Sequence, residues 1–432
     1  MKRKEEETEL MDPKEIEFMN YGIINKYNYS PDKVGNTPIK RWDPLGFNYG
    51  SNERYPQYTY CYGHYSYIST IRAARPMEHK DQGKKTIEND IRTSEDPEWD
   101  SYPIDIIEPM VRGKSYFGAT DYLPAYAIII SDNDKIVDNS FSDQPKIYRN
   151  LSGSAVTMIN RYPAMVRIID PEVLPSLSQA IPNYDPNATI AYGVCMLTFP
   201  RKYYTSIQSI PTDELKSMFL SMIAAIKATT EYATEELKIR AIPISPFINV
   251  GKMAGGSLKR IHIQTYMDLD QDGHGTRTEI LLKSFEWMSE KKACHLCNST
   301  HRNRIILEND EWVMFATGSP IRNYHLRFAP KKHVQSITEL KESELKSLAE
   351  ILRITFAAMD ELNIDPNRNI IWNTRPYGYE TEFHIFGDIL PFEFVGGAEM
   401  ADDMRVVRMS PFIAAQNLKK AIAEKDLVNK YL

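Results

Sequence analysis

One short segment of the sequence combines the residue types that phosphate chemistry needs. Residues 249–264 read NVGKMAGGSLKRIHIQ, with three glycines, three basic residues, a serine, a histidine and a glutamine. A glycine-rich backbone can approach a phosphate closely, and a neutral histidine can act as a nucleophile. His262 is therefore a candidate nucleophile. The competing interpretations are a histidine that only packs in the core and glycines that only shape a turn.

A second group of residues has the types and spacing of a metal site, namely Cys294, Cys297, His333 and His384. The two cysteines form a CxxC motif within ACHLCNSTH. Two thiolates and two imidazoles suit tetrahedral zinc, and four protein ligands make such a site structural rather than catalytic. The alternatives are a redox-active CxxC, buried thiols with unrelated histidines, or ligation by His295 or His301 in place of one of the four.

An acidic segment, DLDQDGHGTRTE, lies at residues 268–279, shortly after the glycine-rich segment. Its acidic residues have the spacing of the ligands in an EF-hand calcium loop. Its candidate ligands are Asp268, Asp270, Asp272 and Glu279. A strand pattern precedes it, whereas an EF-hand loop follows a helix. Two interpretations stay open: a Mg²⁺ or Ca²⁺ site beside the glycine-rich segment, or a solvated acidic loop.

The composition is that of a folded soluble protein. The chain has 432 residues, of which 42% are hydrophobic and 25% charged, and its net charge of −6 does not favour a broad nucleic-acid surface. No apolar run approaches the length of a membrane span, and the charged start MKRKEEETEL is not a secretory signal. We expect a cytoplasmic protein with no membrane partner.

An internal repeat indicates the domain organisation. SIQSIPTDELKS (206–217) matches SITELKESELKS (336–347) at an offset of 130, with a strand pattern before each copy and a long helical pattern after it. We predict an α+β protein made of two fused copies, each an antiparallel sheet with packed helices. The predicted parts are a polar N-terminal extension (1–50), a first half (51–285), and a second half with a C-terminal tail (286–432).

Several motifs resemble, in type and in order, those of the galactose-1-phosphate uridylyltransferase family and its ADP-glucose phosphorylase-like relatives. They are RWDP (41–44), YISTIRAARP (67–76), NRYPA (160–164), FINVGKMAGGSLKRIHIQ (247–264), CHLC (294–297) and FHIFGDILP (383–391). The resemblance covers about residues 41–395. It implies two histidine-triad (HIT)-like halves and a homodimer.

The family's nucleophile is the second histidine of a His-Pro-His-x-Gln motif, and the matching run here is Arg260-Ile261-His262-Ile263-Gln264. The resemblance thus implies catalytic roles for His262 and Gln264. Arg260 stands where many members have a zinc-binding histidine. Alternation along a strand places its side chain on the face of His262, so we expect Arg260 to contact phosphate. In the second half the matching run ends in Phe386, so that half lacks the nucleophile.

The resemblance also implies phosphate or nucleotide contacts from Asn249, Ser257, Arg72 and Arg75. The backbone N–H groups of Gly255 and Gly256 are expected to donate to the phosphate as well. For Asn249 the competing interpretation is a turn former, and for the two arginines it is surface ion pairs.

The implied reaction is transfer of a nucleoside monophosphate between a nucleotide sugar and a sugar 1-phosphate or phosphate, through a nucleotidyl-histidine. UDP-glucose and galactose 1-phosphate are the first expectation. One alternative is an adenylyl-transferring phosphorylase acting on ADP-glucose or a dinucleotide. Another is a catalytically silent protein that binds nucleotide or a macromolecular partner. A third, a calcium-responsive protein, depends on the acidic loop alone.

Overall fold

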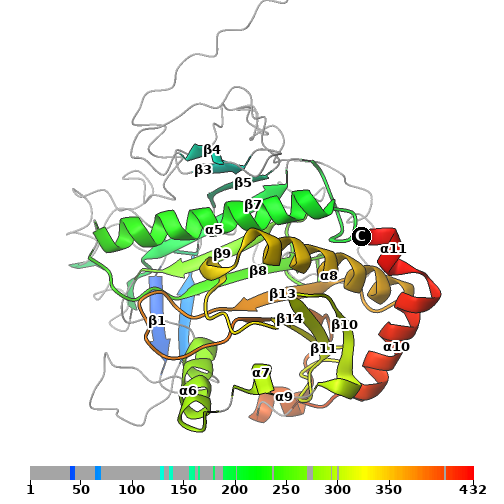
Figure 1. Ribbon diagram of the computed structural model, residues 1–432. Helices are drawn as coiled ribbons and strands as arrows, with labels where there is room; N and C mark the ends of the chain where they lie inside the picture. The colour runs from blue at the N-terminus through cyan, green and yellow to red at the C-terminus, as the bar shows by residue number, and fades with distance from the viewer. Residues whose placement is uncertain are drawn as a thin grey trace, which may run out of the picture.

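The computed structural model (Figure 1) describes residues 39–43, 64–69, 127–130, 136–139, 155–160, 164–165, 179–180, 188–200, 202–235, 238–269, 276–292, 294–298, 301–402 and 405–432. Within these ranges, strands and helices pack into one layered unit.

One large antiparallel sheet runs through the described part of the molecule. Its strands, in spatial order, are β10 (Ile305–Glu308), β11 (Trp312–Ala316), β12 (Leu326–Pro330), β14 (Phe386–Pro391), β13 (Arg368–Asn373), β8 (Ile244–Val250), β9 (Ile263–Asp268), β7 (Gly193–Pro200), β5 (Ala155–Ile159), β3 (Ala127–Ile130) and β4 (Ile136–Asn139). The sheet and the helices packed on it confirm the predicted α+β class.

The two halves meet at the centre of this sheet, where β8 pairs with β13. Outward from this seam, the first half runs β8, β9, β7, β5, β3 and the second half runs β13, β14, β12, β11, β10. Asn249 lies opposite Asn369 in the seam. The predicted repeat is therefore visible in the strand order. The halves differ from the expectation in one respect: they share one continuous sheet.

A backbone hydrogen bond repeated in both halves fixes the equivalence of the two site strands. The Ile261 N–H donates to the Tyr204 carbonyl (N···O 2.7 Å), and the Ile385 N–H donates to the Val334 carbonyl (2.8 Å). His262 and Phe386, which come next in the chain, therefore occupy matching positions.

Two long helices, α5 (Thr212–Glu235) and α8 (Glu342–Glu361), lie side by side on one face of the sheet (Figure 1). Phe219 of α5 packs edge-on against Trp372 of β13, with ring centroids 5.8 Å apart. The α8 segment is helical because its apolar residues recur on one face and its ends are capped. The Glu344 carboxylate accepts from the Lys341 N–H (2.7 Å), and Asn363 follows the helix with a left-handed φ of 51°.

The other face of the sheet, which we call the site face, carries a row of side chains in register. Across neighbouring strands the row is Arg327, Asp388, Ile371, Phe247, Gln264 and Leu197. Directly paired residues of antiparallel strands point to the same face, so all six share the site face. The segment that contains His262 leads into β9, and the metal-ligand residue His384 precedes β14. Both of these strands contribute to the site face.

A small sheet of β2 (His64–Ile68), β1 (Ile39–Asp43) and β6 (Ala188–Ile190) packs beside the first half. Tyr67 of β2 donates a hydrogen bond to the Asp268 carboxylate at the end of β9. Residues 39–43, assigned from sequence to the polar extension, thus form the central strand of a sheet. The rest of that extension lies outside the described residues.

Shorter elements complete the structure, and the first of them crosses the predicted boundary at residue 285 and packs on the second half. They are α6 (Thr276–Glu290), α7 (His295–Asn298), η5 (Arg302–Arg304), η6 (Ile337–Glu339), α9 (Gly397–Asp402), α10 (Pro411–Glu424) and α11 (Leu427–Tyr431). Leu282 and Phe285 of α6 pack with Phe383 and Phe386, while α10 and α11 pack on α8. No helix within the described ranges is long and apolar enough to span a bilayer.

Substitution of two neighbouring isoleucines in β13 tests which side chains face the helices and which lie on the site face. Ile370 is fully buried between the sheet and the helices, whereas Ile371 is half-buried on the site face. We expect Ile370→Ala to lower the free energy of unfolding by about 2–5 kcal/mol because it leaves a cavity. Urea unfolding measures this. The matched Ile371→Ala should cost clearly less, and equal losses would contradict this assignment of the two faces.

Candidate active site and metal centre

His262 is buried immediately before β9, on the side of the sheet where Phe199 of β7 lies. Its exposed fraction is 4%, and its ring stacks on Phe199 with centroids 5.2 Å apart and planes at 27°. The Nδ1–H donates to the Arg260 carbonyl at 2.8 Å. This hydrogen bond selects the tautomer in which Nε2 carries the free lone pair. Among the described residues, Nε2 has no hydrogen-bond partner.

Burial keeps this ring neutral. It lowers the pKa of His262 below its ordinary value of 6.5; the hydrogen bond to the Arg260 carbonyl opposes the shift and the Arg260 charge adds to it. A neutral imidazole with a fixed Nδ1–H and an available Nε2 is the form that attacks phosphorus. Gln264 is two residues further along β9, so its side chain shares the site face with His262.

The glycine-rich loop between β8 and β9 is a closed turn. Gly251 and Gly255 have left-handed φ angles of 83° and 93°, which glycine adopts readily. The Gly255 N–H donates to the Lys252 carbonyl (3.1 Å), and the Gly256 N–H donates to the Gly251 carbonyl (3.0 Å). Both amides expected to bind phosphate are thus engaged inside the turn. The turn interpretation holds for these glycines, and their donation to phosphate is not supported.

The loop is held in place from the second half, which sequence reasoning missed. The Asn369 side chain donates to the Asn249 Oδ1 and to the Ala254 carbonyl, each at 2.8 Å. The Asn367 Oδ1 accepts from the Met253 N–H at 2.9 Å. A side chain at Gly251 would collide with this oxygen. Asn249 therefore belongs to a seam contact as well as to the loop, and Ser257 follows the loop half-buried.

Arg260 is buried and replaces a histidine without losing that histidine's backbone contact. Its side chain is 1% exposed, lies over the Phe199 ring, and donates through Nη2 to the Pro200 carbonyl. In the second half the equivalent contact is His384 Nε2 to the Pro330 carbonyl, at 3.1 Å. This placement does not support the expected contact between Arg260 and phosphate.

The predicted metal ligands converge: one donor atom from each of Cys294, Cys297, His333 and His384 lies within 4.8 Å of the others. His384 Nδ1 is 3.4 Å from the Cys294 Sγ and 3.3 Å from the Cys297 Sγ, and His333 Nδ1 is 3.2 Å from the Cys297 Sγ. Tetrahedral zinc with ordinary bond lengths would set sulfur and nitrogen ligands about 3.5 Å apart. The donor set therefore fits a metal ion.

Outer contacts aim both imidazoles at this centre. The His384 Nε2–H donates to the Pro330 carbonyl, and the His333 Nε2 is 3.5 Å from the Glu382 carboxylate. Each contact leaves Nδ1 facing the sulfur atoms, as ligating histidines require. Burial lowers the pKa of His384 to about 4, with the charge of His333 contributing, so the ring stays neutral.

The two alternative histidine ligands lie outside this group. His295 faces Trp287 with ring centroids 6.2 Å apart. His301 stacks on Phe315 at 3.8 Å and contacts Arg304. Neither belongs to the converging donor set.

The remaining predicted site residues belong to the arginine pair and the acidic loop. Arg72, Arg75, Asp270 and Asp272 lie outside the described residues, and so does the Glu279 side chain. Asp268 is described, and its carboxylate accepts from Tyr67 rather than facing away into an open loop. Phosphate contact by the two arginines and cation binding by the acidic loop stay predictions.

The family model described as scavenger mRNA decapping enzyme C-term binding matches residues 290–391, within the second half. No curated protein matches the chain in sequence.

Among solved structures, a uridylyltransferase is 19% identical with a TM-score of 0.53, over 63% of this chain and 87% of that one. An ADP-glucose phosphorylase from Arabidopsis thaliana, solved with bound ADP-glucose, is 19% identical with a TM-score of 0.52, over 62% and 82% of the two chains. The chain has the uridylyltransferase fold. The resemblance indicated by the motifs is thereby confirmed as a likeness of architecture.

The neutral state of His262 predicts a specific pH dependence of stability. Because the folded pKa is depressed, the unfolded chain binds the proton first as pH falls through about 6.5, and stability is lost. His262→Asn removes this one titration. We expect the unfolding free energy, measured in urea at pH 7.5, 6.5 and 5.5, to fall more steeply in the wild type than in the variant. Identical slopes would contradict a depressed pKa.

Proposed function

We propose that the protein transfers a nucleoside monophosphate from a nucleotide sugar to a phosphate or sugar 1-phosphate acceptor, through a covalent intermediate on His262. The observation that carries this proposal is the hydrogen bond from the His262 Nδ1–H to the Arg260 carbonyl. It fixes the tautomer, and burial keeps the ring neutral, so Nε2 is ready to attack.

In the first step, the Nε2 lone pair of His262 attacks the α-phosphorus of the nucleotide sugar. An N–P bond forms, the bond between phosphorus and the bridging oxygen breaks, and its electrons leave with the sugar 1-phosphate. The imidazole becomes positively charged, and the Arg260 carbonyl, which already accepts the Nδ1–H, stabilises that charge. The leaving phosphate is stable as an anion and needs no proton.

In the second step, an oxygen of the acceptor phosphate attacks the same phosphorus and displaces Nε2. Charge spreads over the phosphoryl oxygens in both steps, so donors must already be in place. We assign this role to the amide of Gln264 and the hydroxyl of Ser257. The loop amides of Gly255 and Gly256 are excluded from it because they bond within the turn.

The base and sugar define two versions of the proposal. Uridylyl transfer between UDP-glucose and galactose 1-phosphate is the first, and adenylyl transfer from ADP-glucose is the second. The fold likeness to a uridylyltransferase and to an ADP-glucose phosphorylase supports both equally. Arg72, Arg75 and a homodimeric assembly are kept as predictions of the resemblance.

The second half is proposed to hold one zinc ion through its two cysteines and two histidines. Four protein ligands leave no open position, so the ion would be structural. When bound, zinc would tie α7 to the start of β14 and to the segment after β12. Cys297 is exposed and lines a cavity of about 420 Å³ together with Cys294 and His333, which gives the ion a path of entry.

Activity assays on three proteins test the transfer. Release of glucose 1-phosphate from UDP-glucose or ADP-glucose, with galactose 1-phosphate or phosphate as the acceptor, should occur in the wild type and be abolished in His262→Asn. Gln264→Leu should lower kcat by about 10²–10³, the effect of removing one preorganised donor.

The matched control is Gln416→Leu, which makes the same change on the exposed side of α10. It should retain wild-type kcat. Full activity in His262→Asn would contradict the proposal. Failure of the folded wild type to act on either donor would favour the catalytically silent binding protein.

Metal analysis tests the zinc site. We expect one zinc per chain in the wild type by elemental analysis, and less than a tenth of that in a Cys297→Ser, His333→Ala double variant, with a lower melting temperature. His295→Ala, which changes an exposed histidine of the same short helix, is the control and should keep its zinc. Wild-type zinc in the double variant would show that these residues are not the ligands.

A further inference from the structure

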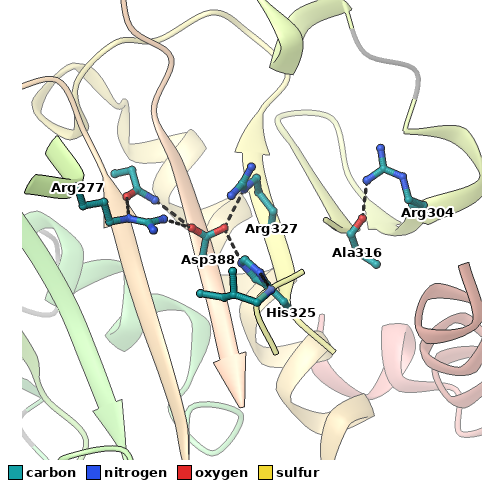
Figure 2. A network of polar contacts seen from close by, with 8 residues as sticks. Arg277, Arg304, Ala316, His325, Arg327 and Asp388 are labelled. Carbon is teal, nitrogen blue, oxygen red and sulfur yellow. Dashed lines mark hydrogen bonds and ion pairs between the residues drawn. The ribbon is translucent and has the colours of Figure 1, made fainter. Parts of the chain in front are cut away.

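The buried carboxylate of Asp388, on β14, contacts cationic and polar side chains at the site face of the second half (Figure 2). The Asp388 side chain is 0% exposed. Its Oδ1 accepts from Arg327 Nε (2.8 Å) and His325 Nε2 (3.0 Å). Its Oδ2 accepts from Arg277 Nη2 (2.7 Å) and Asn373 Nδ2 (3.3 Å). Both oxygens are therefore fully used.

This cluster occupies the position in the second half that is equivalent to the candidate active site of the first half. Asp388 and Gln264 stand in the same register row, one step outside β13 and β8 respectively. Phe386 stands at the position of His262. The second half thus has a phenylalanine at the position of the nucleophile, with Asp388 at the position of Gln264 and Arg327 opposite Asp388 on the next strand. Within this row, Asp388 and Gln264 are separated by three strand spacings, or about 14 Å.

Among the residues that the structure describes, the charges of the cluster do not balance. Burial alone would raise the pKa of Asp388, but the hydrogen bond from His325 and the charge of Arg327 lower it well below its usual range, so the group is an anion. Burial lowers the pKa of His325, whose ring stays neutral. In the described part of the chain, one carboxylate therefore faces the guanidinium groups of Arg277 and Arg327. Arg304 is a third cation near this cluster (Figure 2). Burial lowers the pKa of His301 to about 4, and the charges of Arg304 and Arg327 add to this shift.

The two arginines that hold Asp388 keep unused donors. Arg327 bonds through Nε alone, and its guanidinium lies 4.5 Å from the centroid of the Phe386 ring. Arg277 bonds through Nε to the Asn373 Oδ1 (3.0 Å) and through Nη2 to Asp388. Within the described residues, both terminal nitrogens of Arg327 and the Nη1 of Arg277 have no partner. These side chains are 26% and 50% exposed, so the donors reach solvent.

We propose that Arg277 and Arg327 form a second anion site, which binds a phosphate group on the site face of the second half. Asp388 is the positioning residue, because its buried carboxylate fixes both guanidinium groups and is itself inaccessible to the ligand. Planar guanidinium groups held rigidly and left with free N–H groups suit the oxygens of phosphate. The excess positive charge gives the site its preference for an anion.

Binding of inorganic phosphate, and separately of ADP, tests the site by isothermal titration calorimetry at 0.15 M ionic strength. We expect saturable binding of at least one probe to the wild type. Arg277→Gln should weaken it about tenfold, the loss of one charge-assisted hydrogen bond. Arg327→Lys keeps the charge but loses the fork, and should weaken binding as well.

The controls separate this site from the first half and from general charge effects. Lys419→Gln removes an exposed positive charge on α10 and should bind like the wild type. Gln264→Leu alters the first half only and should also retain the Arg277-dependent binding. Arg277 is half exposed, so its variant is expected to fold, which thermal unfolding verifies. No binding to the folded wild type, or binding insensitive to both arginine variants, would overturn the proposal.

Discussion

The pairing of β8 with β13 is the constraint on which the rest of the structure depends. With Asn249 opposite Asn369, the two halves become one sheet with two faces. One face is sealed by α5 and α8, which must lie side by side because their strands do (Figure 1). The other face then receives both chemically distinctive groups in register, and the second half also supplies the asparagines that hold the first half's glycine loop.

Equivalent positions in the halves have diverged in a complementary way. His384 offers Nδ1 to the metal centre and donates Nε2–H to the Pro330 carbonyl, and Arg260 makes the equivalent of the second contact, to the Pro200 carbonyl. A buried guanidinium thus takes the space of a ligand histidine. The backbone carbonyl of Arg260 accepts the Nδ1–H of His262 and so orients that ring. Conversely, the second half has Phe386 at the position of His262 and therefore lacks the nucleophile. The Arg327 guanidinium lies over the Phe386 ring.

The sequence predicted those features of the structure that follow from motifs and from the periodicity of neighbouring residues. The repeated helix-entry segment, the strand alternation and the CxxC with two histidines led to the fused α+β halves and to a donor set that converges. The contacts of Asn367, Asn369, Arg277 and Arg327 could not be predicted, because they depend on strand register across the seam. The loop amides were misjudged because glycine spacing does not reveal whether a turn closes on itself. None of the motifs that carry the family resemblance lies between residues 77 and 150, and none of them distinguishes uracil from adenine.

We propose that Nε2 of His262 becomes covalently nucleotidylated, and peptide mass spectrometry measures this most directly. The protein would be mixed with UDP-glucose or ADP-glucose without acceptor, digested at neutral pH, and the modified residue located by fragmentation. We expect one nucleoside monophosphate on the peptide that contains His262, removed again by acceptor phosphate. A product formed with the group on any other residue, or turnover with no covalent adduct, would contradict this proposal.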